Sequence, residues 1–91
     1  MTDPIDEYVS RIERACGEEG DYVVILRYER CREALERILS RCRVEKTISG
    51  IMTRASYEGV RLTLFPTGKI LLKGVGDEGE AENLLRELLR A

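Results

Sequence analysis

Residues 60–73 read Val60-Arg61-Leu62-Thr63-Leu64-Phe65-Pro66-Thr67-Gly68-Lys69-Ile70-Leu71-Leu72-Lys73, and their pattern predicts two paired strands. Apolar and polar side chains alternate over residues 60–65, which is typical of a strand with one buried face. Pro66 and Gly68 then stand at the second and fourth positions of a four-residue turn, as a type I turn prefers. Residues 69–73 are therefore expected to return beside residues 60–65 as an antiparallel strand.

The same alternation assigns the two faces of the hairpin, because neighbouring side chains along a strand point to opposite sides of a sheet. One face is aliphatic and should lie under helices: Val60, Leu62, Leu64, Ile70 and Leu72. The other face is cationic and apolar and should stay open: Arg61, Thr63, Phe65, Lys69, Leu71 and Lys73. A further strand is predicted at residues 22–28. It adds Tyr22, Val24, Leu26 and Tyr28 to the core and Val23, Ile25 and Arg27 to the open face.

Three segments carry apolar residues at helical spacing. The first runs from Asp3 to Cys16, with Asp3 as N-cap and Pro4 at the first helical position. The second runs from Glu29 to about residue 41, and its apolar stripe is Cys31, Ala34, Leu35, Ile38, Leu39 and Cys42. The third follows Asp77, which with an acid three residues later resembles a capping box.

The whole chain is expected to form an α+β domain, in which a curved antiparallel sheet of four to five strands carries helices on one face. Residues 44–55 are predicted as one long or interrupted strand, and a turn follows at Glu58-Gly59. A length of 91 residues makes one domain. Within it, residues 1–20 form an N-terminal helical segment, and residues 22–91 hold the sheet and the other two helices.

Composition restricts the classes of protein that this chain can represent. The 15 basic and 17 acidic side chains give a net charge of −2, so a nucleic-acid site would need a local basic face. The abundance of both charges is compatible with a heat-adapted protein. The chain has no apolar run long enough to span a membrane. Its acidic start is unlike a signal peptide, and we expect a cytoplasmic protein.

Enzymatic chemistry is not expected. The absence of histidine removes the most frequent general base and the most frequent zinc ligand. The serines therefore lack a partner for a hydrolase triad. Cys16, Cys31 and Cys42 fall on apolar stripes, where cysteine acts as a small hydrophobic residue. We predict neither a cofactor nor a metal.

Residues 73–79 are rich in glycine and precede the last helix, so a phosphate-binding loop was the alternative to a simple connection. The Gly-Lys-Ser/Thr ending of such a loop is missing, and Asp77, Glu78 and Glu80 crowd the helix start. These acids stabilise the helix dipole and repel phosphate. The segment is predicted to be a strand-to-helix turn.

The stretch from Leu62 to Gly74, followed by an acidic helix start, resembles the signature of one repeat of the TATA-binding protein family. In that family an apolar strand ends in Phe, a turn of small residues leads to Gly-Lys, and the next strand closes with Gly before a long helix. Gly50-Ile51-Met52 is similar to the family's preceding strand, which carries an Ile-Met pair. The resemblance covers residues 22–91, one repeat where the family's protein has two.

This resemblance implies a sheet whose concave side binds the DNA minor groove and wedges Phe side chains between base pairs. Carried over, Phe65 takes a wedge position, and Thr63, Leu71 and Lys73 take concave-face positions. Thr47 stands near the family's other wedge Phe and cannot unstack bases, and Lys73 replaces a small Thr. A lone repeat with half the wedges is not expected to bend a duplex severely.

Two hypotheses of function remain open. The first is a small non-catalytic module that binds DNA or RNA weakly through the open sheet face. Its candidate residues are Arg27, Arg61, Thr63, Phe65, Lys69, Leu71 and Lys73. The second is a protein-interaction subunit that forms a homodimer or docks on a partner through the same face or a strand edge, with no role in nucleic-acid binding.

Overall fold

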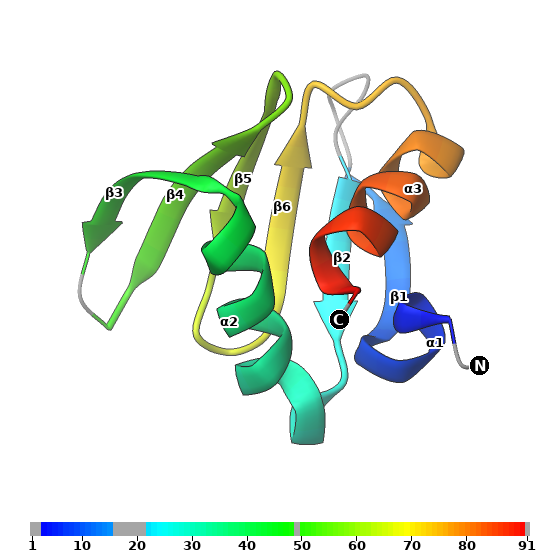
Figure 1. Cartoon of the computed structure of the whole chain (residues 1–91), viewed down its shortest axis with the longest axis horizontal. Helices are drawn as coiled ribbons and strands as arrows, with labels where there is room; N and C mark the ends of the chain where they lie inside the picture. Colours follow the sequence, from blue (N-terminus) through cyan, green and yellow to red (C-terminus); the bar gives the residue numbers. More distant parts are fainter. Residues whose placement is uncertain (1–2, 16–21, 49, 91) are drawn as a thin grey trace.

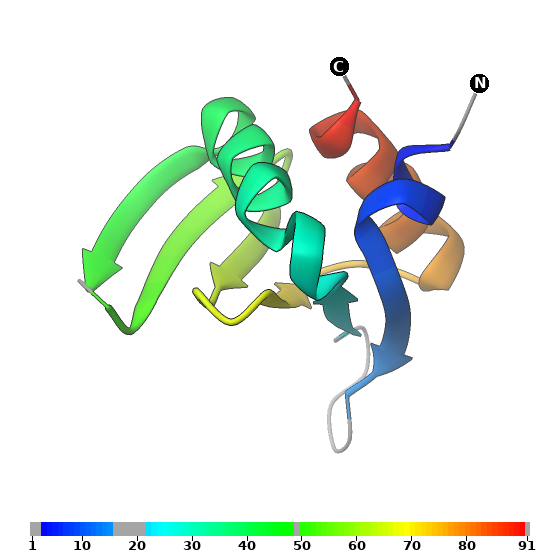
Figure 2. The same cartoon turned by 90° about the horizontal axis from the view of Figure 1, so that it is seen from below.

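Six antiparallel strands form one open sheet, and the helices lie on one side of it (Figures 1 and 2). The computed structural model describes residues 3–15, 22–48 and 50–90. The strands follow the order β1-β2-β6-β5-β4-β3 across the sheet. Their bounds are β1 Val9–Arg14, β2 Tyr22–Leu26, β3 Arg43–Ile48, β4 Met52–Tyr57, β5 Val60–Leu64 and β6 Lys69–Lys73. The helices are α1 Pro4–Tyr8, the 3-10 turn η1 Tyr28–Arg30, α2 Cys31–Arg41 and α3 Glu78–Leu89. The α+β class is confirmed, with six strands in place of four or five.

The hairpin predicted at residues 60–73 is confirmed as β5 and β6. At its turn, the Gly68 amide donates to the Phe65 carbonyl at 3.0 Å, and the Phe65 amide donates to the Lys69 carbonyl at 2.8 Å. Gly68 adopts φ +99°, and a Cβ placed there would lie 3.1 Å from the Cβ of Cys31. This position therefore requires glycine both for its backbone angle and for its close approach to α2.

The single N-terminal helix predicted from Asp3 to Cys16 is wrong. Asp3 does cap a helix, since its Oδ1 accepts from the Ile5 amide at 3.0 Å, but α1 ends at Tyr8 and the chain continues as β1. The register of β1 shifts between Val9 and Arg11. This β-bulge puts Val9 and Ile12 on the same side of the sheet, although residues three apart in a regular strand face opposite sides. In a bulged strand, buried residues can therefore stand three positions apart, as they do in a helix. Cys16 and the predicted turn at residues 20–21 lie outside the described residues.

Of the two alternatives for residues 44–55, one long or one interrupted strand, the interrupted one is confirmed: β3 and β4 are joined by a turn at Gly50, whose φ is +73°. The turn closes with a hydrogen bond from the Ile51 amide to the Ile48 carbonyl at 3.0 Å. The prediction that Tyr28 is a core residue is also wrong. The strand β2 ends at Leu26, the chain turns into η1, and Tyr28 is 87% exposed.

The core lies between the sheet and the helices, as the alternation predicted. Its largest fully buried side chains are Tyr8, Val24, Ile38, Leu62, Ile70, Leu72, Leu85, Leu88 and Leu89. The capping of α3 is confirmed: Asp77 Oδ1 accepts from the Glu80 amide at 2.8 Å, and Glu80 Oε2 accepts from the Gly76 amide at 2.8 Å. Within the described ranges, no helix is long and apolar enough to cross a membrane.

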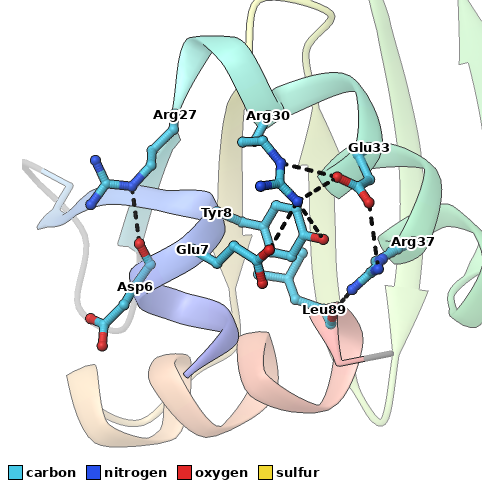
Figure 3. A network of polar contacts seen from close by, with 8 residues as sticks. All are labelled: Asp6, Glu7, Tyr8, Arg27, Arg30, Glu33, Arg37 and Leu89. Carbon is cyan, nitrogen blue, oxygen red and sulfur yellow. Dashed lines mark hydrogen bonds and ion pairs between the residues drawn. The ribbon is translucent and has the colours of Figure 1, made fainter. Parts of the chain in front are cut away.

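A polar network ties the N-terminal segment to α2 (Figure 3). The buried ring of Tyr8 lies between two guanidinium groups, with Arg30 Cζ at 4.9 Å and Arg37 Cζ at 5.1 Å from its centroid. Arg30 Nη2 also donates to Glu7 Oε1 at 2.9 Å and to Glu33 Oε2 at 2.8 Å. This network links α1 to η1 and α2, while the pairing with β2 holds β1 in the sheet.

Candidate functional site

The side of the sheet away from the helices, here called the open face, carries an ordered set of side chains. The strand registers arrange them in three rows that run across the sheet. The first row is Arg43, Ser56, Arg61 and Lys73. The second row is Lys46, Arg54, Thr63, Leu71, Val23 and Glu13. The third row includes Ile48 and Met52 near one edge and Lys69, Ile25 and Arg11 toward the other.

The open face is hollowed around the first two rows. This hollow has a volume of about 400 Å³. The described side chains of the open face that line it are Glu45, Arg54, Arg61, Thr63, Leu71 and Lys73. A volume in this range is typical of a ligand site. The polar side chains that line the hollow come from four neighbouring strands, β3 to β6.

Five cations gather in the first two rows, and we call them the cation block: Arg43, Lys46, Arg54, Arg61 and Lys73. Adjacent strands lie about 4.8 Å apart, and alternate residues of one strand about 6.7 Å apart. The block therefore spans about 14 Å by 7 Å at the level of the backbone. Several positive charges within this area favour a ligand with more than one negative group.

Two cations of the open face, Arg54 and Arg61, differ from the arginines of the helix layer in their partners. On the helices, Arg37 donates to the Leu89 carbonyl at 2.9 Å, Arg41 to the Leu88 carbonyl at 2.9 Å, and Arg86 to Asp3 at 3.0 Å. Among the described residues, Arg54 and Arg61 have no ion pair and no side-chain hydrogen bond. Their donors are therefore available to a ligand.

Four of the seven predicted site residues come together in the hollow: Arg61, Thr63, Leu71 and Lys73. Lys69 also lies on the open face, exposed, in the third row and outside the lining of the hollow. The alternation along β5 and β6 was therefore a sufficient signal for this half of the site.

Arg27 and Phe65 do not lie with the others, and both expectations are corrected. Arg27 follows the last residue of β2, and its Nε donates to the Asp6 carbonyl at 3.0 Å, so it binds α1 (Figure 3). Phe65 begins the turn after β5 and lines a separate shallow groove with Leu35 and Leu39 of α2. The strand β2 ends two residues before its predicted end and β5 ends one residue before, and in each case the chain then leaves the sheet.

Sequence reasoning missed Arg54 and Glu45. Arg54 lies on the open face because β4 begins at Met52, after the turn at Gly50. The prediction of one long or interrupted strand did not locate this turn. Once the turn at Gly50 is known, alternation along β4 assigns Arg54 to the open face. Glu45 lies at the register shift between Val44 and Lys46, and simple alternation cannot place a bulge residue.

Comparison with protein-family models, with curated proteins and with solved structures finds no match for this chain. Among the described residues, no group of three or more Cys, Asp or Glu side chains is arranged to hold a metal ion. On the open face, the described side chains that line the hollow are guanidinium and ammonium donors beside Leu71, with the Thr63 hydroxyl and the Glu45 carboxylate.

Proposed function

We propose that the protein is a small non-catalytic module that binds nucleic acid weakly through its open sheet face. The observation that carries this proposal is the hollow, where Arg54 and Arg61 lie in a block of five cations. Among the described residues, these two arginines have no ion pair and no side-chain hydrogen bond. Each phosphate that such a side chain neutralises releases counterions, which drives association at low salt.

The distribution of acidic side chains also favours binding of a polyanion to the open face rather than to the helix layer. On the described helices and their caps, acids are frequent: Asp3, Asp6, Glu7, Glu29, Glu33, Glu36, Asp77, Glu78, Glu80, Glu82 and Glu87. The described open face has two acids, Glu13 and Glu45. A polyanion is thus repelled by the helix layer and attracted to the open face, although the whole chain carries a net charge of −2.

A TATA-binding-like fold is part of this proposal. An antiparallel sheet with helices on one side is the architecture that the resemblance implies, and residues 22–90 supply five of the six strands. The wedge role of Phe65 is not part of it, because this residue lines the groove beside α2. The proposal is therefore binding through phosphates, without unstacking of base pairs.

Fluorescence anisotropy with labelled DNA and RNA oligonucleotides, at increasing salt, tests the proposal. We expect the slope of log K against log salt to be about −0.9 for each phosphate contacted. Arg54→Gln and Arg61→Gln should each weaken binding of all sequences and reduce the magnitude of the slope by about 1. Arg32→Gln is the matched control, since Arg32 is an exposed arginine on α2 with its nearest carboxylate oxygen 4.0 Å away.

No association with any oligonucleotide at low salt would refute the proposal. So would binding that Arg32→Gln weakens as much as Arg54→Gln does, because the attraction would then reflect overall charge rather than the open face. Circular dichroism of the three variants checks that each remains folded.

Assembly through a strand edge is the second candidate function. Val44 and Ile51 are exposed at and near the outer strand β3, and the β3–β4 hairpin extends beyond α2 (Figures 1 and 2). Both outer strands, however, contain a register shift, in β1 after Val9 and in β3 after Val44. Bulged, charged edges disfavour edge-to-edge pairing, and we expect sedimentation to find a monomer. A dimer that persists at high salt would favour this second function.

The proposed location is the cytoplasm. Cys31 and Cys42 are free thiols in the described structure and lie partly buried against the core. Unpaired thiols of this kind fit a reducing compartment. Mass spectrometry of the protein purified without reductant would contradict this if it found either thiol in a disulfide.

A further inference from the structure

Glu45 is the one carboxylate among the described residues that line the hollow. It lies at the bulge of β3, between Val44 and Lys46, and shares the hollow with Arg54 and Arg61. Within the described part of the chain it forms no ion pair with these cations or with any other. Its lone pairs are therefore available to accept hydrogen bonds from a ligand.

A carboxylate in a phosphate-binding surface weakens the binding of a polyanion, unless the ligand also presents a hydrogen-bond donor to it. Phosphate groups of a nucleic acid offer no donor. The donors that remain are the amino and imino groups of bases and the 2′-hydroxyl of ribose. The position of Glu45 among phosphate-binding cations therefore indicates a donor close to the backbone of the ligand.

Bases are the weaker explanation, because modules that bind splayed bases usually stack them on aromatic side chains. Tyr22 is the one aromatic residue among the described residues that line the hollow, and its register opposite the buried Leu72 places its side chain on the helix side of the sheet. Within the hollow, the described strands therefore present no aromatic side chain on the open face. Tyr8 and Tyr22 are buried with the core, and Tyr57 packs against it and donates to Glu87 at 3.3 Å. The hollow thus suits a sugar–phosphate backbone.

We infer that the open face selects RNA over DNA, with the Glu45 carboxylate accepting a hydrogen bond from a ribose 2′-hydroxyl while Arg54 and Arg61 hold neighbouring phosphates. A carboxylate that accepts from a ribose hydroxyl is a recurrent way to recognise this sugar. The inference rests on the proposed function and names its ligand: a polyribonucleotide recognised through its backbone and independently of its base sequence.

Three oligonucleotides of one base, each about 16 nucleotides long, test this inference in the anisotropy assay. They are oligouridylate, oligodeoxyuridylate and 2′-O-methyl oligouridylate, which share a base and lack stable duplex structure. We expect the wild-type protein to bind oligouridylate about tenfold more tightly than the other two, the contribution of one hydrogen bond to a charged acceptor.

Glu45→Met is the informative variant, and Glu13→Met is its matched control. Glu13 is the other carboxylate of the described open face; it pairs with Arg11 at 3.1 Å and lies outside the described lining of the hollow. Each change removes one negative charge, so a general gain in affinity cancels when the ratio of RNA to DNA affinity is measured. We expect Glu45→Met to abolish the preference for oligouridylate and Glu13→Met to retain it.

Equal affinity of the wild-type protein for oligouridylate and oligodeoxyuridylate would overturn the inference and leave the proposed function standing. The same holds if 2′-O-methyl oligouridylate binds as tightly as oligouridylate, or if both variants change the ratio alike. Failure to bind any of the three at low salt would instead refute the proposed function itself. Glu45 is exposed on an outer strand, so Glu45→Met is expected to fold normally.

Discussion

Replacement of Tyr8 by alanine tests how the N-terminal segment is held in place. Tyr8 is 1% exposed, and its ring packs between Arg30 and Arg37 of the α2 region (Figure 3). Truncation of a buried aromatic side chain costs about 3–5 kcal/mol. The two cation–π contacts add little, because both guanidinium side chains remain more than 30% exposed. The total is a large share of the roughly 5–14 kcal/mol expected for a domain of this length.

The assay is urea denaturation followed by circular dichroism, with Tyr28→Ala as the matched control. Tyr28 is 87% exposed, so its truncation should change the free energy of unfolding by less than about 0.5 kcal/mol. Each kcal/mol lowers the Tm of a domain of this size by about 4–8 °C, so Tyr8→Ala should lower it by at least about 12 °C.

Equal losses from Tyr8→Ala and Tyr28→Ala would refute the reasoning, because Tyr8 would then not be a core residue. Should Tyr8→Ala fail to fold, Tyr8→Phe provides the second measurement. The phenol oxygen accepts from Arg30 Nη2 at 3.3 Å, and its removal should cost about 1 kcal/mol.

Three further predictions concern single side chains. Gly68→Ala should destabilise the domain by about 1–3 kcal/mol, more than Gly50→Ala does in urea denaturation. Both glycines have positive φ, but only at Gly68 does an added Cβ meet a neighbour, at 3.1 Å. Burial raises the pKa of Cys42 to about 11, so iodoacetamide near pH 8 should label this thiol slowly in the native protein. The labelling rate is measured by mass spectrometry, and a rate as fast as that in urea would contradict the prediction. The hydrogen bond from Arg30 lowers the pKa of Glu33, so this pair stabilises the fold above about pH 4 and is lost on acidification. Arg30→Met should therefore flatten the acid side of a stability–pH curve, and an unchanged curve would argue against the pair.

Local sequence patterns were sufficient to predict the helices and strands that have regular geometry. The hairpin of β5 and β6, the stripe of α2 and the capped start of α3 all follow from alternation, helical spacing and turn chemistry. Arg61 and Leu71 could be assigned to the open face for the same reason, since each stands in the middle of a regular strand.

Irregular positions defeated the same rules. Because of the bulge in β1, Val9 and Ile12 lie on one side of the sheet at a spacing typical of a helix. Because of the bulge in β3, alternation could not assign Glu45 to a face of the sheet. Arg27 and Phe65 stand just beyond strand ends, where the backbone turns away from the sheet. A bulge or a strand end is selected by pairing with another strand, and the periodicity of one segment does not contain this information.

Alternation along β5 and β6 was enough to predict which of their side chains are buried and which are exposed, because a strand has a fixed period of two. Only the folded domain shows that the first segment adds a sixth strand beside β2, and that Arg54 and Glu45 reach the same hollow as Arg61. These placements depend on hydrogen bonds between strands and on side chains such as Tyr8, whose partners lie more than 20 residues away. No local periodicity contains that information.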